Sequence, residues 1–283
     1  MPNEFLTNTE SACTEPDKVM MQTAKNTGVH KPEPTGSGDS LTQKMIDANT
    51  LAKTRKLLDH AIVSAWYAVK SERRPPALTP TRWVWRLAGF YHLCHSTPQL
   101  MEEARERFAS ANRQSLAQWA AQKAVEEAGH DQLALRDIQS MGYRAEAVVQ
   151  AFYPPAAKAL MDYFAQSAQD SDPIDCVGYS YTAERLGICI GEGYIQKVES
   201  LLPSGINATR CLRVHSAISA TEVEHVKETV AMIAGLTSQE RDRLARACYQ
   251  AALLRFSPPQ EAYISDEEIE NVLKPLELTE NYN

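Results

Sequence analysis

Two carboxylates and a histidine lie close together in the segment KAVEEAGHDQLALRDIQSMGY, residues 123–143. Glu126 and Glu127 precede His130 by four and three residues, so an α-helix would point all three side chains to one face. Gly129 stands between them, although a glycine inside a helix costs roughly 0.5–1 kcal/mol relative to alanine. Carboxylates and neutral imidazoles are ligands of iron and related ions, so this segment predicts part of a metal site.

A second Glu-x-x-His pattern, Glu222 with His225, occurs later in the chain. His215 lies on the same face of the helix expected there. Glu184 lies between the two patterns in sequence, on the apolar stripe of another expected helix and near that stripe's polar edge. Because a buried carboxylate is costly unless it is paired or binds a metal, Glu184 is a further candidate ligand.

These residues match most of the ligand set of a carboxylate-bridged di-iron centre. Such a centre in a helical bundle takes a glutamate from each of two helices and a Glu-x-x-His from each of two others. The sequence supplies three of these four elements, and the helix that contains His92 would supply the fourth. The candidate metal ligands are therefore His92, Glu127, His130, Glu184, Glu222 and His225, with Glu126 and His215 as weaker candidates. The simpler alternatives are surface Glu–His pairs and histidines that are buried without a metal.

Helical periodicity dominates from Leu41 onward, with no competing strand pattern. We expect an all-α bundle of about seven helices. Their predicted ranges are 42–70, 79–110, 113–141, 144–169 with a proline interruption, 172 to the LLPSG sequence at 201–205, 207–234, and 237 to the SPP sequence at 257–259. Thr79 before Pro80 and the TSQE capping box at 237–240 mark two helix starts. Residues 1–42 read as a disordered tail, 43–262 as one domain, and 263–283 as a C-terminal tail in which SDEEIE starts a short helix.

Composition excludes several classes of function. The net charge of −7 and the lack of a basic cluster argue against nucleic-acid binding. The N-terminus has no secretory signal pattern, and no apolar run approaches the roughly 20 residues that span a bilayer. Six scattered cysteines without a C-x-x-C motif suit reduced thiols. We expect a cytoplasmic protein that binds neither nucleic acid nor membrane.

The motifs resemble those of the heme-oxygenase-like di-iron oxidases and oxygenases, a family that includes the Chlamydia protein associating with death domains. FYHLCHSTPQLMEEARERF and VEEAGHDQLALRDIQSMGY resemble the first two metal-bearing helices, and the form EE-x-GHD is the most specific part. GYSYTAERLG resembles the third, with Glu184, and VHSAISATEVEHVKE resembles the last, with Glu222 and His225. The similarity covers about residues 43–256, with the motifs in the family's order.

The resemblance implies a heme-oxygenase-like bundle with a di-iron centre, or a manganese–iron centre, that activates O2 as co-substrate. It further implies an electron donor and a small amino-acid- or fatty-acid-like substrate, in reactions that serve natural-product biosynthesis. Gly129 would then allow a neighbouring helix or the substrate to approach closely, as would Gly187, Gly191 and Gly193. The oligomeric state is left open, with a homodimer as one option.

The chain departs from the family at its closing helix. The family pattern His-x-x-x-Asp-x-x-His falls on Ile218, Glu222 and His225, so the first histidine is missing. His215 could replace it only if the helix is locally irregular, and the Ser and Thr residues of SAISAT favour such a distortion. We therefore expect two iron sites of unequal affinity, the tighter one formed by Glu127, His130 and Glu184.

Two other readings stay open. A heme oxygenase or a cofactor-processing enzyme on the same fold would use His92 or His95 as a heme ligand. A metal-free helical interaction protein would use the bundle as a docking surface.

Overall fold

The computed structural model describes residues 47–72, 75–257 and 264–278, and most of these residues are helical. In chain order the helices are α3 (Ala48–Val69), α4 (Pro80–His95), α5 (Thr97–Ser110), α6 (Gln114–Glu127), α7 (His130–Ser140), α8 (Ala145–Ala151), α9 (Pro155–Gln169), α10 (Asp175–Gly187), α11 (Glu192–Leu201), α12 (Arg210–Val214), α13 (Ala220–Ala234), α14 (Ser238–Phe256), α15 (Asp266–Leu273) and the 3₁₀ helix η2 (Lys274–Leu276). The predicted all-α class is confirmed. The predicted tail, residues 1–42, lies outside the described residues.

Several helix starts follow directly from local sequence. The Thr79 side chain accepts a hydrogen bond from the Arg82 backbone N–H, and Pro80 occupies the first position of α4. Thr237 and Glu240 form the expected capping box of α14. Ser265 caps α15 in the same way, so the short helix expected at SDEEIE is present.

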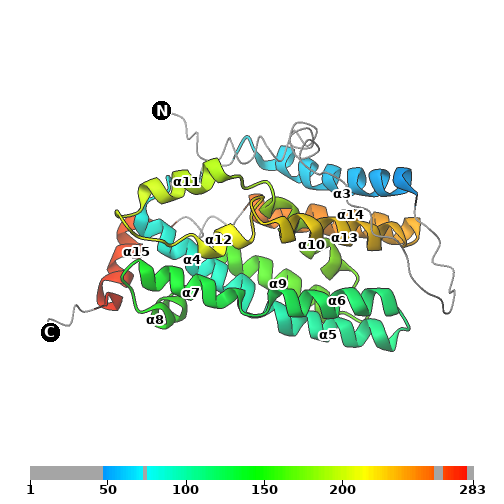
Figure 1. Cartoon of the computed structure of the whole chain (residues 1–283), viewed down its shortest axis with the longest axis horizontal. Helices are drawn as coiled ribbons and strands as arrows, with labels where there is room; N and C mark the ends of the chain where they lie inside the picture. The colour runs from blue at the N-terminus through cyan, green and yellow to red at the C-terminus, as the bar shows by residue number, and fades with distance from the viewer. Residues whose placement is uncertain (1–46, 73–74, 258–263, 279–283) are drawn as a thin grey trace, which may run out of the picture.

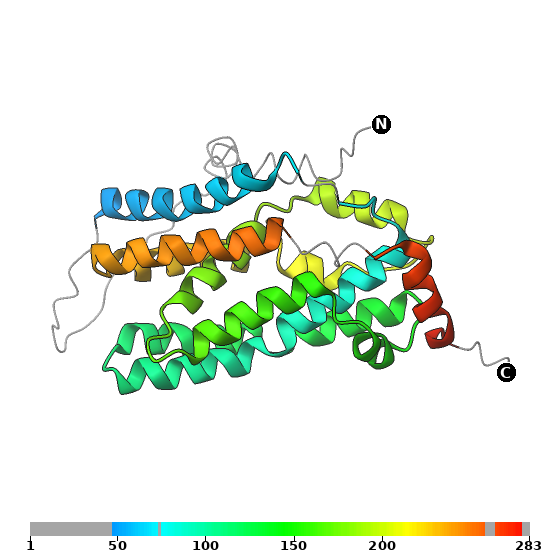
Figure 2. The same cartoon turned by 180° about the vertical axis from the view of Figure 1, so that it is seen from behind.

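The helices form an elongated bundle (Figures 1 and 2), and most of its buried apolar side chains belong to two large clusters. In one half α3 packs along α14, and α5 packs along α6. Their core includes Leu58, Phe108 and Phe164. In the other half α4 packs against α7, α8 and α15 around a core that includes Trp83 and Ile138.

Four of the predicted long helices are interrupted, which corrects those predictions. Breaks separate α4 from α5 at Ser96, α6 from α7 at 128–129, α10 from α11 at 188–191, and α12 from α13 at 215–219. The last break is the irregularity expected near SAISAT. Consequently, many candidate ligands lie at helix ends rather than along continuous helices.

Gly129 explains one of these breaks through its own conformation. Its φ of 85° lies in the left-handed region, which glycine adopts without the steric penalty of a Cβ. A Cβ placed there would meet no atom within 4 Å, so the expected close approach of a neighbouring helix at Gly129 is wrong. The same holds at Gly191 and Gly193, whereas at Gly187 the close approach is real.

The described part of the chain contains no helix that is long and apolar enough to cross a membrane.

Candidate metal site

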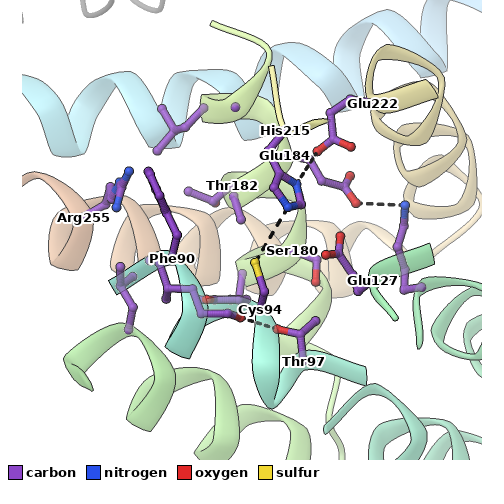
Figure 3. A pocket seen from close by; sticks show the side chains of 18 of the residues that line it. Phe90, Cys94, Thr97, Glu127, Ser180, Thr182, Glu184, His215, Glu222 and Arg255 are labelled. Carbon is purple, nitrogen blue, oxygen red and sulfur yellow. Dashed lines mark hydrogen bonds and ion pairs between the residues drawn. The ribbon is translucent and has the colours of Figure 1, made fainter. Parts of the chain in front are cut away.

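A cavity of about 180 Å³ opens where the interrupted helices meet. Apolar side chains such as Leu93, Met101 and Leu160 form much of its wall. Glu127, Glu184, Glu222 and His215 gather on one side of it (Figure 3). The cavity therefore combines an apolar space for a small molecule with a concentrated set of metal-binding groups.

One group of possible ligands consists of Glu127, His130 and His215. One ligand atom from each lies within 4.8 Å of the others. The His130 Nδ1 is 3.0 Å from Glu127 Oε2, and the His130 and His215 rings meet edge to face with centroids 4.7 Å apart. Burial alone would raise the pKa of Glu127, but the interactions with His130 and His215 hold it below its usual value.

A second group surrounds Lys123. Its Nζ lies 2.9 Å from Glu184 Oε1 and 2.7 Å from Glu126 Oε2, and its side chain is only 3% exposed. Burial would lower the pKa of Lys123, but these carboxylates raise it, so the ammonium stays charged. Lys123 thus supplies a buried positive charge between two candidate ligands.

Glu222 joins the two groups. Its Oε1 lies 3.8 Å from His215 Nδ1, and its Oε2 lies 3.4 Å from His225 Nδ1. The other nitrogen of His225 is 3.2 Å from Glu126 Oε1. Five of the six principal candidate ligands, together with Glu126 and His215, therefore belong to one connected cluster of carboxylates, imidazoles and a lysine.

Glu184 is a buried carboxylate whose charge its neighbours compensate only in part. Its side chain is 6% exposed, and burial raises its pKa to about 7, against the opposing effect of Lys123 and with help from Glu222 and Glu127. Its Oε2 is buried and has no hydrogen-bond partner within the described part of the chain. A buried carboxylate oxygen without a partner is costly, and a cation would satisfy it.

His92 does not join the cluster, which corrects the expectation that α4 contributes this imidazole. Its Nε2 lies 3.0 Å and 2.8 Å from the carbonyl oxygens of Val149 and Phe152, and its ring stacks on Tyr153. His95 instead pairs with Asp131 at 2.8 Å. Neither histidine lines the cavity, so neither presents an imidazole to a heme placed there.

The break between α12 and α13 explains how His215 reaches the cluster. Ile218, at the position of the missing family histidine, is 44% exposed, while His215 lies against Glu222 and His130. The pKa of His215 is raised well above its usual value, because Cys94, Glu222 and Glu127 outweigh the lowering effect of burial. A raised pKa means that the imidazole of His215 tends to carry a proton on both nitrogens, so a metal ion that binds His215 would have to displace one of them.

The absence of a Cβ at Gly187 lets the backbone of His215 pack closely against α10, and alanine at this position should disturb this contact. The Cβ would overlap the carbonyl oxygen of His215, which belongs to the backbone and cannot rotate away. We expect Gly187→Ala to reduce the free energy of unfolding by about 1–3 kcal/mol, measured by urea denaturation. Gly191→Ala is the matched control, since its Cβ meets nothing within 4 Å. An equal effect of both substitutions would contradict this packing role.

The cluster fits a resident metal on its donor chemistry. The ligand atoms of Glu127, His130 and His215 all lie within 4.8 Å of one another, so small side-chain shifts could bring them around one ion. Opposite ligands of an octahedral ion with bonds of about 2.1 Å are roughly 4.2 Å apart. Glu222 and the unpartnered oxygen of Glu184 provide further carboxylate donors. Mixed oxygen and nitrogen donors of this kind suit iron or manganese.

Sequence reasoning missed Lys123, Cys94 and Cys211. Lys123 precedes Glu126 and Glu127 by three and four residues, so its helical spacing already placed it on their face. The two cysteines carry no such signal, because they are far apart in sequence and meet only in the fold.

Comparison with known proteins identifies the fold. A solved structure described as a domain of unknown function with a heme oxygenase-like fold, from Shewanella denitrificans OS217, is similar to this chain with a TM-score of 0.51. The match covers 82% of this chain and 94% of that one, at 20% sequence identity. The chain thus has a heme oxygenase-like fold, as the sequence predicted. No protein-family model and no curated protein sequence matches the chain.

Proposed function

We propose that this protein is a non-heme di-iron oxidase or oxygenase that uses O2 to oxidise a small amino-acid- or fatty-acid-like substrate. The observation that carries the proposal is the convergence of Glu127, His130, Glu184, Glu222 and His225 beside an apolar cavity. His215 joins this set. The heme oxygenase-like fold is compatible with such a site.

In this proposal Glu127, His130 and His215 would hold one iron ion. Glu126, Glu184, Glu222 and His225 would hold the other. Iron in this environment supplies the capacity to activate O2 with electrons from an external donor.

The cavity would bind and orient the substrate. Its apolar walls exclude water from the reacting region and favour a substrate with an apolar body. Arg255 also lines the cavity, and Figure 3 shows it across the cavity from Glu184 and Glu127. A guanidinium there would attract the carboxylate of a substrate. An acid bound in this way would place its carboxylate near Arg255 and its apolar chain toward the carboxylate cluster.

The test is anaerobic loading with ferrous iron, elemental analysis, and O2 consumption with panels of amino acids and medium-chain fatty acids. We expect iron to bind and at least one substrate class to accelerate O2 consumption. Glu127→Gln should lower the rate by more than about 100-fold, since even changes beside metal ligands cost 10–100-fold. The control is Glu224→Gln, an exposed glutamate on α13 that pairs with Lys227. A protein that binds no iron, or one that binds heme with a Soret band, would refute the proposal.

A further inference from the structure

The Nδ1 atom of His215 lies near Glu222 of the carboxylate cluster, whereas its Nε2 atom faces two cysteine side chains. Its Nε2 lies 3.8 Å from Cys94 Sγ, and Figure 3 shows the thiol pointing at the ring. Cys211, from α12, completes the group: one ligand atom from each of Cys94, Cys211 and His215 lies within 4.8 Å of the others. Cys94 is 8% exposed and Cys211 is 1% exposed.

The chemistry of this group differs from that of the carboxylate cluster. Two thiolates and one imidazole are three of the four ligands of a tetrahedral site for a soft divalent cation such as Zn²⁺. With Zn–S bonds of about 2.3 Å and Zn–N bonds of about 2.05 Å, a tetrahedral S···N edge is about 3.6 Å. The 3.8 Å between Cys94 Sγ and His215 Nε2 already approaches that edge.

The position of the group also favours binding. All three side chains line the cavity, so a fourth ligand can come from a water molecule or a small molecule in that space. Cys176 and Cys248 are also buried free thiols, but among the described residues they take part in no comparable group. Burial alone therefore does not account for the meeting of two thiols with an imidazole.

We infer that Cys94, Cys211 and His215 form a second metal site, selective for a soft divalent cation and distinct from the carboxylate cluster. The two sites share His215. A neutral imidazole has one nitrogen with a free lone pair, while the other carries hydrogen. A soft cation held by the thiolates therefore competes with the carboxylate cluster for this one residue.

Titration of the reduced full-length protein with Co²⁺, a spectroscopic substitute for Zn²⁺, tests the site without any activity measurement. Cobalt bound by thiolates gives a near-ultraviolet charge-transfer band, and carboxylate–imidazole coordination does not. We expect the band in the wild type and in Glu127→Gln. Cys94→Ser and Cys211→Ser should each abolish it and weaken Zn²⁺ binding by more than about 100-fold. Cys176→Ser is the matched control, and it should keep the band.

A second measurement uses the unaltered protein, so it does not depend on the folding of the variants. Zn²⁺ should slow maleimide alkylation of Cys94 and Cys211, read by peptide mass spectrometry, and leave the rate at Cys248 unchanged. Cobalt binding without a thiolate band, together with alkylation that Zn²⁺ does not slow, would overturn the inference. This outcome is separate from the fate of the proposed function, because ferrous binding at the carboxylate cluster needs neither thiol.

Discussion

His215→Ala should abolish the tighter step of ferrous binding as completely as His130→Ala does. The sequence alone assigned the tighter site to Glu127, His130 and Glu184 and gave His215 only to the weaker one. The structure groups the ligand atoms of Glu127, His130 and His215 within 4.8 Å, whereas Glu184 is held by Lys123. Loss of either imidazole removes one of three principal donors, so we expect affinity to fall by more than about 100-fold.

Calorimetric titration of the metal-free protein with ferrous iron, under anaerobic conditions, measures this effect. Both variants should retain only a weak step. His95→Ala is the control, because His95 is exposed, pairs with Asp131 and does not line the cavity. If His215→Ala keeps the tight step and loses only the weak one, the original assignment with Glu184 is correct and the grouping inferred from the structure is not.

The fold class was predictable because apolar residues recur every three to four positions over long stretches of the chain, and only an α-helix gathers such residues on one face that can be buried. The helix starts were also predictable where a side chain satisfies free backbone N–H groups, as at Thr79 and Thr237. The breaks were harder to predict, since the hydrophobic period continues across an interruption of a few residues. Local warnings came from Pro98 in the first turn of α5, from Gly129, which adopts φ of 85°, and from the Ser-rich segment after His215.

Much of the candidate site could be anticipated, because carboxylates on otherwise apolar helix faces are costly without a partner. What sequence could not supply is which partner each carboxylate finds. The spacing of Lys123 placed it on the face of Glu126, but a lysine is normally a solvated surface residue, so its burial to 3% exposure and its pairing with Glu184 were not predictable. His92 does not join the cluster because its Nε2 lies within hydrogen-bonding distance of two backbone carbonyl oxygens. No sequence pattern reveals these backbone partners.

The buried ammonium of Lys123 pairs with Glu126 and Glu184, which are two of the carboxylates of the proposed second iron position, so replacing this residue should have a large effect. Lys123→Met keeps an unbranched apolar stem and removes the charge. In the metal-free protein this leaves Glu184 buried without its counter-charge. Breaking a buried ion pair by removing one partner costs about 3–5 kcal/mol, and we expect a loss of that size at pH 8.5.

The loss should depend on pH in a defined direction. The pKa of Glu184 is about 7 in the folded wild type and about 4.5 in an unfolded chain, so the folded state prefers the protonated carboxyl. Wild-type stability attributable to Glu184 is therefore greatest below pH 4.5 and falls, by about 3 kcal/mol, as pH rises to 7. Without Lys123, the charges of Glu222 and Glu127 remain and raise the pKa of Glu184 further, so the decline should continue above pH 7. At pH 5.5 the variant should lose much less stability than at pH 8.5.

The same substitution should strengthen the second step of metal binding. A divalent cation no longer competes with an ammonium for Glu126 and Glu184, so its affinity should rise tenfold or more. Binding to the folded state alone raises stability, so Mn²⁺ should restore more of the variant's melting temperature than it adds to the wild type. Lys227→Met, which removes an exposed lysine paired with Glu224, should stay within about 0.5 kcal/mol of the wild type. A Lys123→Met protein that is equally unstable at both pH values and gains nothing from Mn²⁺ would show that Lys123 acts through packing alone.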